Sequence, residues 1–155
     1  MTDHSRLEDA VNTYENTLYR AALAILGDRH EAEDAVQDAF LRYWEKTPTF
    51  EGPEHERAWL LRVLSNGCKS RLRAPWRRRT VPLLESYPAA PEERETLELV
   101  YSLPAKERMA VHLYYYEGYK TAEIARITGE REGTVRSRLS RARVHLKDML
   151  KGEAR

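Results

Sequence analysis

Apolar residues recur every three or four positions along most of the chain, which is the spacing of one helix face. No strand-length stretch alternates apolar and polar residues, and Ala, Leu, Glu and Arg dominate the long segments, so we predict an all-α fold. The first helix is predicted at about residues 5–26, with a buried stripe of Leu7, Val11, Tyr14, Leu18, Ala21, Ala22 and Ile25. Gly27 is the expected C-cap of this helix, and Asp28 with Glu31 forms a capping box for the next.

Two further helices complete the first half of the chain. The second is predicted to run to about Lys46, and its core stripe is Ala32, Ala35, Val36, Ala39, Phe40 and Tyr43. Two prolines and a glycine in 47–53 break the pattern. A third helix begins near Glu54, places Trp59, Leu60, Val63 and Leu64 at helical spacing, and is interrupted by Pro75. Asn66-Gly67 is expected to weaken or bend it.

The chain is predicted to form two small helical domains, 1–79 and 93–155, joined by a linker at 80–92. Pro82, Pro88 and Pro91 lie close together there, and no periodic apolar face accompanies them. The second domain is expected to open with a helix at about 93–101. Another starts with Pro104 in its first turn and runs to Tyr116, and Gly118 ends it.

The strongest motif is a helix-turn-helix at 121–146. A short helix at 121–128, a turn at 129–132 and a last helix at about 133–150 are predicted. Ala125 permits close crossing of the two helices, Gly129 accepts positive φ in the turn, and Val135 packs back on the first helix. The core stripe of the last helix is Val135, Leu139, Ala142, Leu146 and Met149.

The opposite face of the last helix carries short hydroxyls and arginines. Its members are Thr134, Ser137, Ser140 and Arg141, flanked by Arg136, Arg138 and Arg143. Arginine bridges guanine edges, and serine, threonine and arginine all bind phosphates, so this face suits the major groove of DNA. The alternative is a basic surface helix that contacts nothing.

Charge is segregated along the chain, although the formal net charge is only +1. Residues 28–56 hold nine acids and three Lys/Arg, whereas 57–79 hold eight Lys/Arg and no acid. Residues 85–117 hold seven acids and three bases, and 120–151 hold nine bases and four acids. Two separate basic faces suggest two contacts with one polyanion, and the alternative is solvated helix faces.

Composition narrows the function classes further. The single cysteine, Cys68, excludes an intrachain disulfide and a cysteine-based metal site. No apolar run approaches the roughly 20 residues of a membrane span, and no basic-then-apolar leader opens the chain, so a cytoplasmic location without membrane insertion is expected. His30 and Asp34 have a spacing that could share a metal, but surface roles are far commoner. Without a phosphate loop, nucleophile elbow or zinc spacing, we expect neither catalysis nor a cofactor.

Two stretches of the sequence match a known family. The first is Ala32-Glu33-Asp34-Ala35-Val36-Gln37-Asp38-Ala39-Phe40-Leu41 followed by residues 58–66, and the second runs from Leu103-Pro104 through Glu123-Ile124-Ala125 to residues 133–143. With them the chain resembles, over nearly its whole length, the sigma factors of bacterial RNA polymerase of the extracytoplasmic-function (ECF) type. The first stretch is similar to the family's region two and the second to region four.

The resemblance implies a role for each face. The face formed by Asp34, Gln37, Asp38 and Leu41 would dock on the clamp helices of the beta-prime subunit of core RNA polymerase, and the family also contacts the beta flap. The third helix and its basic end would bind the melted non-template strand of the −10 element through Arg62, Asn66, Lys69, Arg71 and Arg73. The last helix would read the duplex −35 element through Thr134, Arg136, Ser137, Arg138 and Arg141. The family also implies an anti-sigma factor as a partner.

Some features depart from the family pattern or admit another interpretation. The loop 50–56 corresponds to the segment that captures a flipped base, yet it carries Glu51, Glu54 and Glu56, which repel phosphates. Many relatives have an aspartate soon after Asn66, where this chain has Cys68-Lys69-Ser70. Asn66 also suits a turn, and Trp59 suits the core. The competing function is a helix-turn-helix repressor or regulator acting outside the polymerase, which would leave the first 80 residues unassigned.

Overall fold

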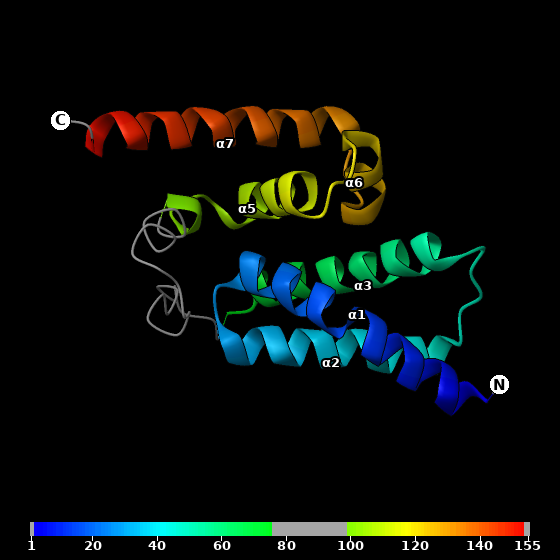
Figure 1. Cartoon of the computed structure of the whole chain (residues 1–155). Coiled ribbons are helices and arrows are strands. Elements are labelled where there is room, and N and C mark those ends of the chain that lie inside the picture. The colour runs from blue at the N-terminus through cyan, green and yellow to red at the C-terminus, as the bar shows by residue number, and fades with distance from the viewer. Residues whose placement is uncertain (1, 76–98, 154–155) are drawn as a thin grey trace.

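The computed structural model describes residues 2–75 and 99–153, and every regular element within them is a helix (Figure 1). The all-α prediction is therefore confirmed. The elements are α1 (Asp3–Leu26), α2 (Arg29–Lys46), α3 (Pro53–Arg73), α5 (Ala105–Val111), the π-helix η2 (His112–Tyr116), α6 (Thr121–Thr128) and α7 (Glu132–Glu153). The predicted linker at 80–92 and most of the helix predicted at 93–101 lie outside the described residues.

The ends of α1 and α2 follow the local signals in the sequence. Gly27 adopts φ 68° and donates its backbone N–H to the Leu23 carbonyl, which closes α1 as expected of a glycine C-cap. The Asp28 carboxylate accepts the backbone N–H of Glu31 at 2.9 Å and begins α2. These two adjacent caps turn the chain so that α2 packs beside α1.

Helix α3 passes through Asn66 and Gly67 without interruption, because burial of Leu64 and Cys68 on either side outweighs the roughly 1 kcal/mol cost of a helical glycine. One predicted boundary is wrong. The helix predicted to run from Pro104 to Tyr116 is α-helical only to Val111, and Pro104 is its N-cap rather than part of its first turn.

The continuation, η2, is a single wide π turn. The backbone N–H of Glu117 donates to the His112 carbonyl at 3.0 Å, five residues back. The turn keeps Leu113 buried and leaves Tyr115 and Tyr116 exposed.

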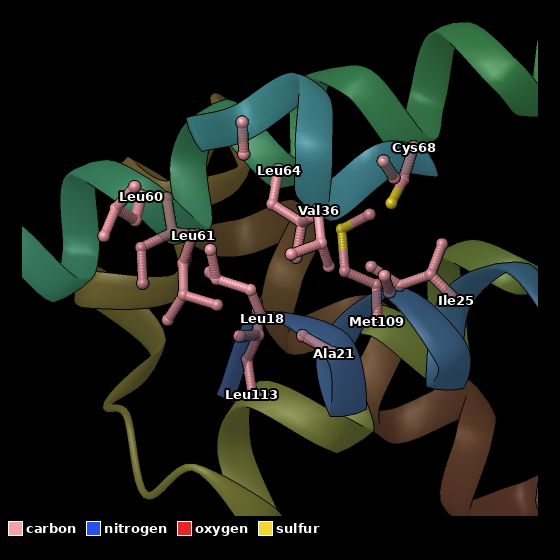
Figure 2. Close-up of a cluster of buried hydrophobic side chains, with 14 of the residues drawn as sticks. Leu18, Ala21, Ile25, Val36, Leu60, Leu61, Leu64, Cys68, Met109 and Leu113 are labelled. Atoms are coloured by element: carbon pink, nitrogen blue, oxygen red, sulfur yellow. The ribbon is translucent and has the colours of Figure 1, made fainter. Parts of the chain in front are cut away.

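The two halves of the chain share one continuous core. Figure 2 shows Leu18 and Ala21 of α1 beside Leu113 and Met109 from the second half, with Leu61 and Leu64 of α3 on the other side. Helix α5 lies between α7 and α1, and α6 contacts α3 (Figure 1). All of the residues named here from Figure 2 are at most 2% exposed.

Hydrogen bonds also join the two halves at the end of α1. The last carbonyls of a helix lack intrahelical partners. Arg108 of α5 donates to the carbonyls of Ala24 and Ile25, and the Tyr101 hydroxyl adds a second bond, at 3.1 Å, to the Leu23 carbonyl that also accepts from Gly27. The second half thereby completes the C-terminus of a helix in the first. None of the described helices is both long enough and apolar enough to cross a membrane.

Candidate functional site

The outer face of α2 presents the four residues that the sequence grouped together. Asp34, Gln37, Asp38 and Leu41 are all exposed, because the opposite stripe of small residues (Ala32, Ala35 and Ala39) is buried against α1 and α3. Leu41 is 56% exposed. The face is therefore polar and acidic around one apolar side chain.

Leu41 stands on a ridge between two grooves. One groove, of about 540 Å³, runs between α1 and α2 and is mainly apolar, with Phe40 and Trp44 in its wall. The other, of about 550 Å³, lies between α2 and α3 and includes Asp38 and Arg71. A partner helix seated on this ridge would contact an apolar side chain with polar groups beside it.

The predicted −10 residues of α3 divide between two environments. Arg62, Asn66 and Arg73 are exposed. Lys69 is instead half-buried, and its ammonium donates a hydrogen bond to the Thr128 carbonyl at the end of α6. Burial lowers the pKa of the Lys69 ammonium, and the nearby carboxylate of Glu130 opposes that effect.

Arg71 connects the predicted DNA face to the predicted polymerase face. Its guanidinium donates to the Asp38 carboxylate at 2.9 Å, and the two side chains are 19% and 59% exposed. An ion pair with this much exposure contributes at most about 1 kcal/mol. The ion pair between Arg71 and Asp38 is therefore weak enough for either side chain to change its partner.

The loop before α3 is tied to the core by aromatic contacts. Phe50 is half-buried, with its ring centroid 6.0 Å from that of Tyr43 and 5.8 Å from that of Trp59. Trp59 is also half-buried and packs against the core, in agreement with its predicted place there. The Tyr43 hydroxyl donates at 2.7 Å to Glu56 in the first turn of α3, so one of the three acids of 50–56 is engaged within the protein.

A cleft of about 660 Å³ separates this loop and the start of α3 from the second half of the chain. Trp59 and Arg62 line one wall, and Arg126 and Ile127 of α6 line the other. The candidate −10 surface thus faces the helix-turn-helix in this arrangement.

The helix-turn-helix forms as its sequence predicts. Gly129 has φ 72°, Ala125 is 9% exposed at the crossing of α6 and α7, and Val135, Leu139 and Ala142 are buried. Arg136, Ser137 and Arg141 are exposed on the outer face of α7, and Thr134 is half-buried beside them. The predicted face therefore exists as one surface.

Two arginines of the α7 face are held by carboxylates of the helix-turn-helix. Arg138 donates both Nε and Nη2 to one oxygen of Glu130, at 3.0 and 2.7 Å, and both side chains are 16% exposed. Arg136 donates to Glu132 at 3.3 Å across one helical turn and remains 63% exposed.

A polar cluster between the halves was not found from the sequence. Arg57 of α3 donates to the Glu117 carboxylate and, at 3.1 Å, to the Tyr119 hydroxyl. His112 lies 3.1 Å from the other Glu117 oxygen, and the Glu117 side chain is 3% exposed. Neither periodicity nor spacing indicates this cluster, because its members come from α3, the π turn and the loop after it.

Burial and charge act in opposite directions on Glu117. Burial raises its pKa, but the hydrogen bond with His112 and the charges of His112, Arg57 and Arg20 outweigh burial and hold the pKa below 4.5. Burial also raises the pKa of Tyr43 to about 12, and the bond to Glu56 acts in the same direction. Among residues 2–75 and 99–153, no three His, Cys, Asp or Glu side chains gather as a metal site would require.

Comparison with known proteins identifies the family. Residues 10–78 match the family model of Sigma-70 region 2, and residues 93–146 match that of Sigma-70 region 4. The ECF RNA polymerase sigma factor SigM of Mycobacterium tuberculosis is 31% identical over 154 residues, which cover 96% of this chain and 79% of SigM. The chain belongs to the ECF RNA polymerase sigma factors. It is accordingly a transcription-initiation factor, and the repressor alternative is not favoured.

Solved structures resemble this sigma factor over most of its length. The sigma factor RpoE in complex with the anti-sigma factor NepR, from Bartonella quintana, matches with a TM-score of 0.77 and 27% identity, over 93% of this chain and 96% of RpoE. CnrH in complex with the cytosolic domain of CnrY matches with a TM-score of 0.67 and 25% identity, over 96% and 90% of the two chains. The predicted resemblance to ECF sigma factors is thus confirmed.

Proposed function

We propose that this sigma factor binds core RNA polymerase through α2 and promoter DNA through α3 and α7, and so directs the polymerase to promoters with defined −10 and −35 elements. The α2 face of Asp34, Gln37, Asp38 and Leu41 would bind the clamp helices of the beta-prime subunit, and the second half would contact the beta flap. The observation that supports this most directly is that α2 exposes a leucine among polar groups on a ridge flanked by two grooves. The polymerase would perform the chemistry.

The two DNA surfaces differ in the strand form that they suit. Exposed Arg62, Asn66 and Arg73, with Lys69 and Arg71 nearby, would hold the melted strand of the −10 element, because single strands are bound by cations beside stacking surfaces. On α7, Thr134, Arg136, Ser137, Arg138 and Arg141 would contact the duplex −35 element through the major groove.

The arrangement in which the two halves share one core is here the closed form. The halves would have to separate from it before the −10 and −35 elements are read together. Elements centred about 25 base pairs apart are separated by about 85 Å at 3.4 Å per pair. A compact chain of this length has a radius of gyration of about 15 Å, so the closed form is too small. The two described halves are 23 residues apart in sequence, and a segment of that length spans at most about 80 Å, which is enough for the halves to separate. An anti-sigma factor would act by favouring the closed form.

Run-off transcription tests the proposal. Purified core polymerase is assayed with and without this protein on a pooled library of bacterial promoter fragments. New transcripts that require the protein, and whose start sites share two upstream elements, are expected. Absence of protein-dependent transcripts, with sequence-specific duplex binding by the protein alone, would overturn the proposal in favour of a free regulator.

Two substitutions separate polymerase binding from DNA reading. Leu41→Ala is expected to weaken capture by immobilised core polymerase, and the exposed acid change Asp9→Ala on α1 is its control for surface substitution. Arg141→Ala is expected to lower transcription with core binding unchanged, with Lys147→Ala as the control for loss of one exposed positive charge on α7. If both changes alter core binding equally, the assignment of faces is wrong.

A further inference from the structure

Arg138 pairs with Glu130 near the start of α7, the second helix of the helix-turn-helix. One residue along an α-helix turns the side chain by about 100°, so Arg138 lies between the outward Ser137 and the buried Leu139. It is only 16% exposed, whereas Arg136 is 63% exposed. Of these two arginines, Arg138 is thus the less available to DNA.

The partner of Arg138 lies in the turn that sets the angle between α6 and α7. Glu130 follows Gly129, and its backbone N–H donates to the Ala125 carbonyl at 3.0 Å. Its carboxylate accepts two hydrogen bonds from Arg138, which is in the second turn of α7. The turn is therefore fixed to α6 by its backbone and to α7 by its side chain.

A second contact acts at this turn only in the closed form, because it joins the two halves. The Lys69 ammonium of α3 donates to the Thr128 carbonyl, directly before the turn. The pair of Arg138 and Glu130, in contrast, lies wholly within the helix-turn-helix, so it persists when the halves separate. A carboxylate held by charge-assisted bonds is a stiffer support than a neutral turn.

We infer that Arg138 and Glu130 act as one unit that positions α7, and that Arg138 is a positioning residue for −35 recognition rather than a residue that reads a base. The inference rests on the proposed function and narrows the role of one member of the α7 face. Arg136, Ser137 and Arg141 then carry the direct contacts, and their placement depends on a carboxylate that itself repels DNA.

Reading a base and positioning α7 are two roles of Arg138 that predict opposite effects of removing the Glu130 charge. If Arg138 read a base, Glu130→Gln would release it and remove a negative charge near DNA, so binding would improve. If the pair positions α7, Glu130→Gln and Arg138→Ala lower recognition alike, and the double variant is no worse than either single one.

The test uses holoenzyme assembled from core polymerase and the full chain. Initiation is measured on promoters that share one −10 element and carry either the matched −35 element, each single base-pair change in it, or a scrambled one. We expect the matched-to-scrambled ratio to fall about tenfold in Glu130→Gln, in Arg138→Ala and in the double variant, across several base pairs. Asp148→Ala, which removes an exposed acid farther along α7, is expected to leave the ratio unchanged.

A gain of initiation in Glu130→Gln, or a loss in Arg138→Ala confined to one base pair, would overturn the inference. An unchanged ratio with fewer active molecules would mean that the pair only supports folding, and would also overturn it. Amide hydrogen exchange of residues 129–132 in the free chain provides a second reading, which does not require a promoter. Exchange is expected to rise in both single variants, and unchanged exchange contradicts the inference even if the wild-type chain initiates nowhere.

Discussion

The helices of the two halves differ in length, and therefore in how stable each would be in isolation. Helices α1, α2 and α3 have 24, 18 and 21 residues, whereas α5, η2 and α6 have 7, 5 and 8. Isolated helices shorter than about 12–15 residues are marginal in water. The first half is therefore a bundle of long helices, and the second half depends on α7 and on contacts with α1 and α3.

This difference explains where polar bonds between the halves lie. Arg57 and Lys69 of α3 reach the loop after η2 and the end of α6, so the ends of the shortest elements are held by side chains of the long ones. A DNA-binding motif supported in this way is expected to lose stability when its support is removed.

The largest effect is expected from Leu113→Ala. Leu113 is 2% exposed and lies against Leu18 of α1 (Figure 2), so its truncation leaves a cavity between the halves and lowers the free energy of unfolding by about 3 kcal/mol. Urea unfolding is followed by far-UV circular dichroism and, in a Trp76→Phe background, by fluorescence of Trp44 and Trp59 in the first half.

Because the core is continuous, both signals are expected to shift together in one transition. An early transition by circular dichroism with unchanged fluorescence would show that the halves unfold independently. Leu150→Ala is the matched control, since Leu150 is 54% exposed and its truncation is expected to change stability by less than about 0.5 kcal/mol.

A smaller loss is expected from Arg57→Ala. The Glu117 carboxylate would stay buried without the guanidinium that faces it, which costs about 2 kcal/mol. Arg62→Ala on the same helix removes an exposed arginine and is expected to change the free energy of unfolding by less than about 0.5 kcal/mol. Equal effects of the two substitutions would mean that the bond between the halves contributes nothing beyond surface charge.

Two glycines of the helix-turn-helix are expected to respond in opposite directions. Neither has an atom within 4 Å of the place that a Cβ would occupy, so only backbone conformation matters. Gly129→Ala forces alanine into φ 72° and is expected to cost about 1 kcal/mol. Gly133→Ala lies in the first turn of α7 and is expected to gain about 0.5 kcal/mol. Thermal unfolding of both variants measures the difference, and a loss in both would contradict it.

The smallest effect concerns acid stability. Folding lowers the Glu117 pKa below 4.5, so the stabilisation from this group is present above about pH 4.5 and is lost as pH falls through the folded pKa. Urea midpoints between pH 7 and pH 3 are expected to fall more steeply for the wild-type chain than for Glu117→Gln below pH 4.5. Parallel curves would show that Glu117 has the same pKa in the folded and unfolded chain.

Local signals in the sequence were sufficient to predict most of the helices and the faces that they expose. The caps at Gly27 and Asp28, the turn at Gly129 and the stripe through Val135, Leu139 and Ala142 depend on neighbouring residues, which periodicity and turn chemistry detect. The exposed faces of α2 and α7 followed because a helix that buries one stripe must expose the opposite one.

Such local signals do not predict which side chains bond to distant parts of the fold. Lys69 was grouped with the DNA-facing residues of α3, but it donates to the Thr128 carbonyl, 59 residues away in sequence. Arg138 was grouped with the reading face, but Glu130 holds it through a pairing eight residues back, which is not a helical spacing because the turn intervenes. The π turn at 112–116 likewise gives no sign in a pattern that fits a regular helix.

The all-α class, the helix-turn-helix and the family follow from the sequence alone, because they depend on periodicity, caps and short motifs. The core shared by both halves, the bond between Arg57 and Glu117 and the exposure of each α7 arginine depend instead on how the helices pack. The physical reason is range: helix formation is governed by residues three or four positions apart, whereas the partner of a long charged side chain is set by which elements pack together.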